Sequence, residues 1–87
     1  MTRFIKSARN QTERGLSFEL VEQMDWLTAR VREDRRRDYG EVLLQIFAKL
    51  RGRLYAAVVT PRGRDLRVIS FRKANDREVK AYEQEKG

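Results

Sequence analysis

The stretch from Arg51 to Tyr82 constrains the fold most, because residues that favour strands alternate there with cations. Segments 53–60 (RLYAAVVT) and 66–71 (LRVISF) are rich in the branched and aromatic residues typical of strands. Between them, 61–64 (PRGR) has the composition of a hairpin loop. Ten lysines and arginines lie between Lys49 and Lys80, so the predicted sheet is also a strongly basic surface. Such a surface favours an anionic ligand, and RNA is the preferred candidate.

A helix is expected directly after this hairpin. Asn75 can cap it, and Glu78 stands three residues later, as in a capping box. The helix is predicted from Asp76 to about Glu85, with Val79 and Tyr82 forming a narrow apolar stripe.

The N-terminal half is predicted to be largely helical. Residues 4–14 suit a short basic helix that ends at Gly15, and Ser17 can cap a second helix. Residues 27–32 fit either the continuation of that helix or a half-buried strand, and the pattern does not decide between them. The apolar run 42–48 predicts a central strand. We therefore expect an α+β fold with two N-terminal helices, an antiparallel sheet of three to four strands and a C-terminal helix.

Length and composition narrow the possible functions. The 87 residues predict a single domain over 1–87, and the net charge of +7 points to polyanions or an acidic partner. The chain contains no cysteine and no histidine, so disulfides and thiolate zinc sites are excluded, and we expect no metal and no cofactor. No apolar run reaches membrane-spanning length and no signal peptide is evident, so we expect a soluble cytoplasmic protein without a membrane partner.

Cations are predicted to gather where the last strand meets the last helix. Arg72, Lys73 and Arg77 belong to this junction, and Arg53 can emerge at the same rim. The helix N-terminus adds backbone N–H groups that suit a phosphate. Each of these arginines could equally be a solvated strand-end residue.

Such a site could cleave RNA by transfer of the 2′-hydroxyl to the adjacent phosphate. We predict that Arg72, Arg53 and Lys73 would stabilise the negative charge that develops on phosphorus. Without histidine, proton transfer would need a carboxylate, a tyrosine or a lysine with a lowered pKa. The candidates for proton transfer are Glu41, Glu78 and Tyr82, together with Tyr39 and Tyr55.

Other residues could contact RNA outside the reacting phosphate. The predicted RNA-binding residues are Arg35, Arg37, Arg51 and Arg77. Acidic residues flank the run Arg35–Arg37 and offset about half of its positive electrostatic field, so the run could also be a solvated loop. Trp26 could stack on a base, or it could belong to the core.

The chain resembles the toxins of the BrnT family over nearly its whole length. The string GRLYAAVVTPRGRDLRVISFRKANDREVKAYE is similar to the C-terminal half of these toxins. Upstream, Asp34-Arg35-Arg36 and Tyr39-Gly40-Glu41 are similar to the family's D-R-R and Y-G-E elements, and 15–19 include its G-x-S-F-E segment.

The resemblance implies a RelE-like fold, a metal-independent endoribonuclease that halts translation, and a type II toxin–antitoxin module. The implied partner is a BrnA-like antitoxin with a DNA-binding domain, bound to the toxin in a hetero-oligomer. The resemblance also favours a strand at Thr28–Glu33, which would be the fourth strand of the sheet. The chain departs from the family pattern at three positions: Arg14 replaces a histidine, Leu43 an arginine and Ala48 a glycine. It also begins almost on the expected helix, whereas the family begins with a short strand. The positions that match the family motifs are Arg53, Ser70, Arg72, Lys73, Glu78 and Tyr82.

Two alternatives to a toxin endoribonuclease remain open. A catalytically inactive module of the same fold could bind RNA or the antitoxin, and the departures at Arg14 and Leu43 favour it. A DNA-binding regulator is the weaker alternative, because nothing in the chain resembles a recognition helix for the major groove.

Overall fold

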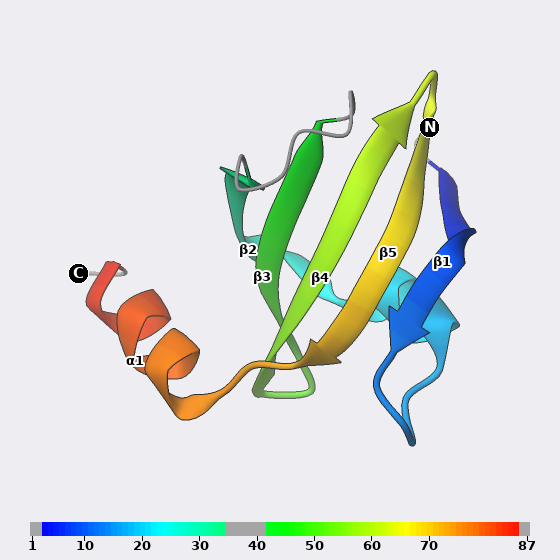
Figure 1. Ribbon diagram of the computed structural model, residues 1–87. Helices are drawn as coiled ribbons and strands as arrows, with labels where there is room; N and C mark the ends of the chain where they lie inside the picture. Colours follow the sequence, from blue (N-terminus) through cyan, green and yellow to red (C-terminus); the bar gives the residue numbers. More distant parts are fainter. Residues whose placement is uncertain (1–2, 35–41, 86–87) are drawn as a thin grey trace.

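The computed structural model of the protein describes residues 3–34 and 42–85. These residues form five strands, a short 3₁₀ helix and one α-helix, arranged as in Figure 1. In chain order these elements are β1 (Arg3–Thr12), η1 (Phe18–Gln23), β2 (Asp25–Asp34), β3 (Leu43–Leu50), β4 (Arg53–Arg62), β5 (Asp65–Lys73) and α1 (Asp76–Glu85). No helix in these described residues is long and apolar enough to cross a membrane.

All five strands form one mixed sheet in the order β1-β5-β4-β3-β2. Strand β1 runs parallel to β5, and every other neighbouring pair is antiparallel. The hairpin predicted at 61–64 forms, but its turn comprises only Gly63 and Arg64, because Pro61 and Arg62 belong to β4. Left-handed backbone occurs here and in the β3–β4 turn: Gly63 has φ of 58°, and Arg51 and Gly52 have φ of 53° and 83°. Glycine adopts this region without the steric cost that a side chain brings.

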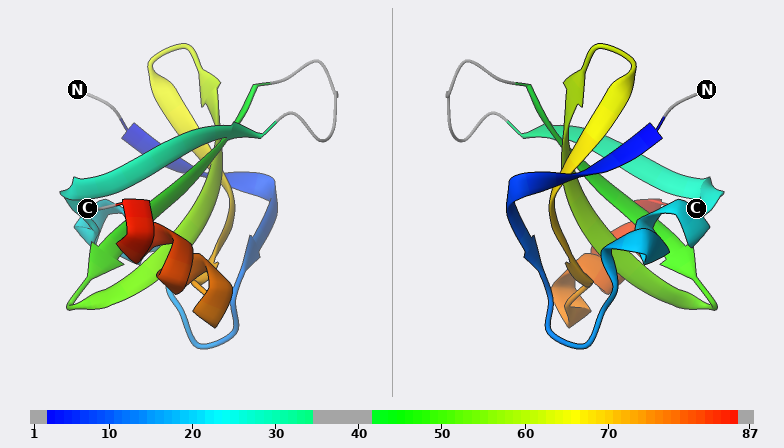
Figure 2. Two further views of the ribbon diagram at one scale, coloured as in Figure 1. Left: turned by 90° about the vertical axis from the view of Figure 1, so that its left-hand side faces the viewer. Right: turned by 90° about the vertical axis from the view of Figure 1, so that its right-hand side faces the viewer.

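The sheet twists strongly, so that its two edge strands approach one another at one end (Figure 2). The ring of Phe4 on β1 stacks on that of Trp26 on β2, with centroids 5.3 Å apart. Trp26 remains 36% exposed. It therefore packs partly in the interior, and one side of its ring is already covered.

The main core lies between this curved sheet and η1, which passes behind the sheet in Figure 1. Alternate residues of β3 and β4 point into it, as expected for strands with one face buried. The buried members are Val21, Met24, Ile46, Ala48, Leu50, Ala57, Val59, Val68 and Phe71. Helix α1 lies beside the β2–β3 edge, away from η1.

The prediction of two N-terminal helices is wrong. Residues 4–14, expected to be helical, form most of β1, which pairs with β5 in a register shifted between Lys6 and Gln11. Within the shift, the side-chain amide of Asn10 donates to the carbonyl oxygen of Val68 at 2.8 Å. The backbone hydrogen bonds and apolar contacts of this long-range pairing outweigh a weak local helix preference. The chain thus has a strand before η1.

The second expected helix is only η1, a single short 3₁₀ segment. The hydroxyl of Ser17 bonds the carboxylate of Glu19 and makes no cap to a backbone N–H group. Residues 27–32 belong to β2, so the strand alternative was correct. The sheet is therefore five-stranded and mixed, where three to four antiparallel strands were predicted.

Candidate functional site

The sheet has a second face, which points toward α1. Residues that are Cα partners on neighbouring strands lie side by side on this face. They form two rows: Arg30, Phe47, Ala56 and Arg72 in one, and Arg32, Gln45, Val58 and Ser70 in the next. Arginines from β2 and β5 therefore flank a mostly apolar strip from β3 and β4.

Helix α1 and these rows enclose a pocket of about 210 Å³, which we call the α1 groove. Its lining residues are Arg30, Arg32, Gln45, Phe47, Arg77, Glu78, Ala81, Tyr82 and Glu85. The lining thus combines three arginines and two glutamates with the aromatic rings of Phe47 and Tyr82. The guanidinium groups could bind an anion that displaces a glutamate carboxylate.

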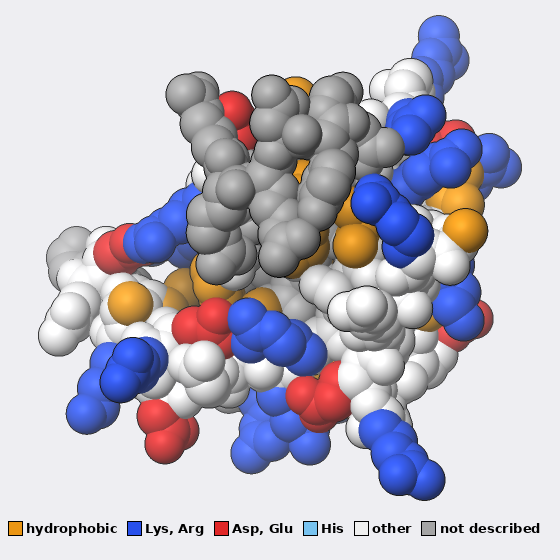
Figure 3. Space-filling view, in the orientation of Figure 1, with side chains coloured by type: hydrophobic (Ala, Val, Ile, Leu, Met, Phe, Trp, Pro, Cys, Tyr) orange, Lys and Arg blue, Asp and Glu red, His pale blue; other side chains and the backbone are white. Residues whose placement is uncertain are grey.

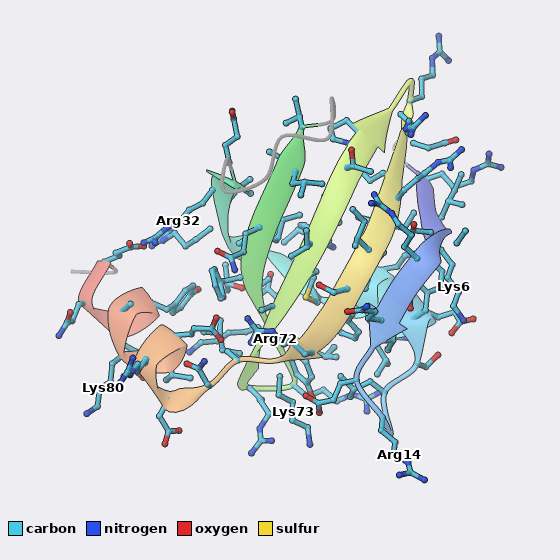
Figure 4. All side chains as sticks on the ribbon, viewed as in Figure 1. Lys6, Arg14, Arg32, Arg72, Lys73 and Lys80 are labelled. Atoms are coloured by element: carbon cyan, nitrogen blue, oxygen red, sulfur yellow. The ribbon has the colours of Figure 1, made fainter. Side chains whose placement is uncertain are left out.

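Arg72 and Glu78 form a bidentate ion pair at the edge of the α1 groove (Figure 4). The Nη1–Oε1 distance is 2.7 Å and the Nη2–Oε2 distance is 2.8 Å. The side chains are 39% and 19% exposed, respectively, so solvent screens this pair only in part. Both Nη atoms of the guanidinium are therefore already occupied by a carboxylate that belongs to the protein.

The predicted capping box at the start of α1 is confirmed. The backbone N–H of Glu78 donates to Asn75 Oδ1, and that of Asn75 donates to Glu78 Oε1, both at 2.9 Å. Hydrogen bonding from Arg72 lowers the pKa of Glu78 below its usual 4.5, although partial burial opposes the shift. The same hydrogen bonds raise the pKa of Arg72. Glu78 is therefore ionised at neutral pH, which is the state in which a carboxylate can accept a proton.

Tyr82 attaches the middle of α1 to the sheet. Its hydroxyl donates to the carbonyl oxygen of Thr28 at 2.6 Å, and the residue is 6% exposed. The guanidinium carbon of Arg30 and the ammonium nitrogen of Lys49 lie 5.6 Å and 5.9 Å from the ring centroid. Near the end of the helix, Arg32 pairs with Glu85. The hydroxyl proton of Tyr82 is thus engaged by the backbone.

The structure separates the three residues predicted to be catalytic. Arg72 points toward α1, whereas Lys73 follows it on the strand and points to the other side of the sheet (Figure 4). Lys73 is the Cα partner of Tyr55, and Arg53 lies two residues before Tyr55, so Arg53 shares the side of Lys73. Both Arg53 and Lys73 are exposed.

The other predicted residues are placed as follows. Arg77 lines the α1 groove, and Arg51 is exposed in the β3–β4 turn. The ring of Tyr55 stacks on that of Phe71 against the core. The predictions for Arg35, Arg37, Tyr39 and Glu41 lie outside the described residues.

Sequence reasoning missed Arg30, Arg32 and Gln45 as groove residues. The alternation within 27–32 carried the signal, since a strand there places Arg30 and Arg32 on one face. Whether that face is also the face of Arg72 depends on how β2 pairs with β3. This register cannot be read from the sequence of β2 alone.

A metal site does not emerge from the described residues. Within 3–34 and 42–85, no three acidic side chains come close enough together to hold an ion.

A family model described as ribonuclease toxin, BrnT, of type II toxin–antitoxin system matches residues 4–78. The match covers most of the chain and includes the strands and the cap residues that build the α1 groove. The chain is thus one of the ribonuclease toxins of type II toxin–antitoxin systems. Within that class it belongs to the BrnT family, which confirms the resemblance read from the sequence, and this membership implies an antitoxin partner. No curated protein and no solved structure gives a significant match.

Proposed function

We propose that this protein is a metal-independent endoribonuclease that cleaves RNA in the α1 groove and thereby inhibits translation in the cytoplasm. The observation that carries the proposal is that arginines from β2 and α1 line the α1 groove together with Glu78, whose carboxylate pairs with Arg72 of β5 at the groove's edge. Cations fixed on rigid strands stabilise charge that develops on a phosphate, and a carboxylate beside them can accept a proton.

In the proposed reaction, a phosphate of the RNA displaces Glu78 from the guanidinium of Arg72. The planar fork of arginine fits two phosphate oxygens as it fits two carboxylate oxygens. Arg30, Arg32 and Arg77 add positive charge around the same site.

The released carboxylate of Glu78 then accepts the proton of the 2′-hydroxyl. The 2′ oxygen bonds to phosphorus, the bond to the 5′ oxygen breaks, and that oxygen takes a proton from water. The products are a 2′,3′-cyclic phosphate and a 5′-hydroxyl end. Glu78 is preferred over Tyr82 as the proton-transfer group, because the Tyr82 hydroxyl is held by the Thr28 carbonyl.

The test is RNA cleavage in excess EDTA, with the product ends identified chemically. The proposal expects cleavage without added metal and 2′,3′-cyclic phosphate ends. Cleavage that requires a divalent ion, or products that carry 5′-phosphates, would overturn it.

The ion pair between Arg72 and Glu78 also favours a second candidate function. Because Arg72 is fully engaged by Glu78, the protein could instead bind RNA or antitoxin without cleaving either. RNA binding at low salt with no cleavage under any metal condition would support this inactive module.

We also propose that the antitoxin carries a DNA-binding domain and covers the α1 groove in a hetero-oligomer. An acidic segment of the antitoxin would complement the net charge of +7 and could engage the arginines that Glu78 and Glu85 now occupy.

A further inference from the structure

A second basic surface lies at the opposite end of the sheet from α1. Figure 3 shows Lys and Arg side chains gathered beside the β4–β5 hairpin, at the upper right. The hairpin patch, as we call it, consists of Arg3, Arg62, Arg64 and Arg67. Arg3 and Arg62 are the Cα partners of Asp65 on its two sides, and Arg3 pairs with its carboxylate at 3.4 Å.

The patch keeps cations available for a ligand. Arg64 and Arg67 are exposed, and no hydrogen bond or ion pair with another described residue engages either side chain. The pair between Arg3 and Asp65 is also weakly held, since the Arg3 side chain is 73% exposed. Arg64 and Arg67 are therefore the two cations of the patch that are available to a ligand.

The hairpin patch and the α1 groove lie on one face of the sheet. Arg67 is the Cα partner of Thr60 on β4. Thr60, Val58 and Ala56 are alternate residues of β4, so they point to the same side of the sheet. Val58 and Ala56 are in turn the Cα partners of Ser70 and Arg72. The β4 partners of Arg67 and Arg72 are four residues apart, so at about 3.3 Å per residue Arg67 lies roughly 13 Å from Arg72. The half-buried Ser70 stands between them on the same face. The spacing suits an extended chain of phosphates that follows β5.

We propose that the hairpin patch is a second RNA-binding subsite, which holds the backbone of single-stranded RNA a few nucleotides from the phosphate in the α1 groove. The inference rests on the proposed function and specifies its substrate as an extended strand. Phosphate contacts from arginine add affinity and register without reading bases. The patch therefore contributes to the binding of long RNA and adds no sequence preference.

The surroundings of the patch favour RNA over an acidic protein segment. Protein interfaces have an apolar centre with a polar rim. Among the described residues, the exposed large apolar side chains are Trp26, Leu27, Val31 and Val42, none of which belongs to the hairpin. A surface of arginines without such a centre suits a phosphate backbone.

The test measures how binding depends on salt. The probes are a labelled single-stranded RNA of about 20 nucleotides, long enough for both sites, and a dinucleotide with one phosphodiester. Both are 2′-O-methylated, which blocks the attacking hydroxyl and prevents cleavage during the measurement. The variant Arg64→Gln/Arg67→Gln is compared with Arg14→Gln/Lys80→Gln, which removes the same charge from exposed positions outside the patch and the groove (Figure 4).

Each phosphate contact contributes about 0.7 to the slope of log K against log salt for single strands, so the hairpin variant should reduce the slope by about 1.4 with the long probe. Its binding of the dinucleotide, followed by NMR, should equal that of the parent. An equal loss of slope in the control variant would mean diffuse charge attraction and would overturn the subsite.

Three further outcomes separate the hypotheses. If the parent cleaves RNA and the hairpin variant binds the long probe as the parent does, the subsite is wrong and the proposed function stands. If the parent neither binds nor cleaves RNA, the proposed function fails together with the subsite. If the hairpin variant loses affinity for the antitoxin alone, the patch binds protein and the inference is wrong.

Discussion

At the residue scale, Glu78 connects folding with the proposed chemistry. Its carboxylate accepts the two Nη hydrogen bonds of Arg72 and completes the capping box with Asn75. The proposed reaction requires the first of these contacts to break while the second holds α1 in place. Substitutions at Glu78 therefore separate its two roles.

Glu78→Gln should reduce RNA cleavage by about 10² to 10⁴, the usual contribution of a positioned general base. Its affinity for uncleavable 2′-O-methylated RNA should stay equal or rise, because the phosphate no longer competes with a carboxylate for Arg72. Glu85→Gln, which removes the other glutamate of the groove, is the matched control and should keep most of the activity. Parental cleavage by Glu78→Gln would assign the proton transfer to another group.

The ion pair also makes stability depend on pH. The pKa of Glu78 is lowered in the folded state, so its contribution to the free energy of unfolding is fully present above its usual 4.5 and is lost as the pH falls through the lowered folded value. Urea unfolding of the parent and of Glu78→Gln should therefore differ most near neutral pH and converge once the pH falls below the lowered folded pKa of Glu78. A difference that grows on acidification would show that the carboxylate is not stabilised in the folded state.

At the element scale, α1 is attached to the sheet mainly by polar contacts and by the ring of Tyr82. The main core lies on the other side, so α1 contributes the wall of the groove more than it contributes to the core. Loss of a single anchor should consequently weaken α1 while the sheet remains folded.

Tyr82→Phe should lower the free energy of unfolding by about 1 kcal/mol, since the hydroxyl of Tyr82 donates one hydrogen bond to the Thr28 carbonyl. Cleavage should change little, because the ring and its contacts with Arg30 and Lys49 remain. Urea unfolding and RNA cleavage are measured on the same preparation. A loss of activity of about 10² or more at parental stability would instead place Tyr82 in proton transfer.

The elements that could be predicted from the sequence were those specified by neighbouring residues. The hairpin within 61–64 and the capping box of Asn75 and Glu78 depend on local turn and cap chemistry, and both form, although the turn itself is only Gly63 and Arg64. Strand β1 depends on pairing with β5, more than fifty residues away, so its local pattern was misread as helix. The candidate groove shows the same division: the local sequence places Arg72, Arg77 and Glu78 together at the strand–helix junction, whereas the position of Arg30 and Arg32 depends on the register of β2. Strand alternation separates Arg53 and Lys73 from Arg72, although the sequence interpretation grouped all three.

At the scale of the whole molecule, the net charge of +7 allows RNA and an acidic antitoxin segment to be attracted to the same surface. We expect the antitoxin to displace labelled RNA from the toxin, and the RNA affinity of the free toxin to fall steeply as salt rises. Simultaneous binding of both partners would place the antitoxin elsewhere and would require another route of inhibition. An RNA affinity that does not depend on salt would exclude a phosphate-binding groove.

The proposed reaction depends on Arg72 on the α1 face. This dependence is tested by RNA cleavage in EDTA by the parent, by Arg72→Ala, by Arg72→Lys and by Arg53→Ala, with circular dichroism and urea unfolding as controls for folding. We predict that Arg72→Ala loses about 10² to 10³ in rate, that Arg72→Lys recovers only part of it, and that Arg53→Ala on the other side of the sheet stays near the parent. Cleavage by a folded Arg72→Ala variant at the parental rate would show that Arg72 does not stabilise the transition state.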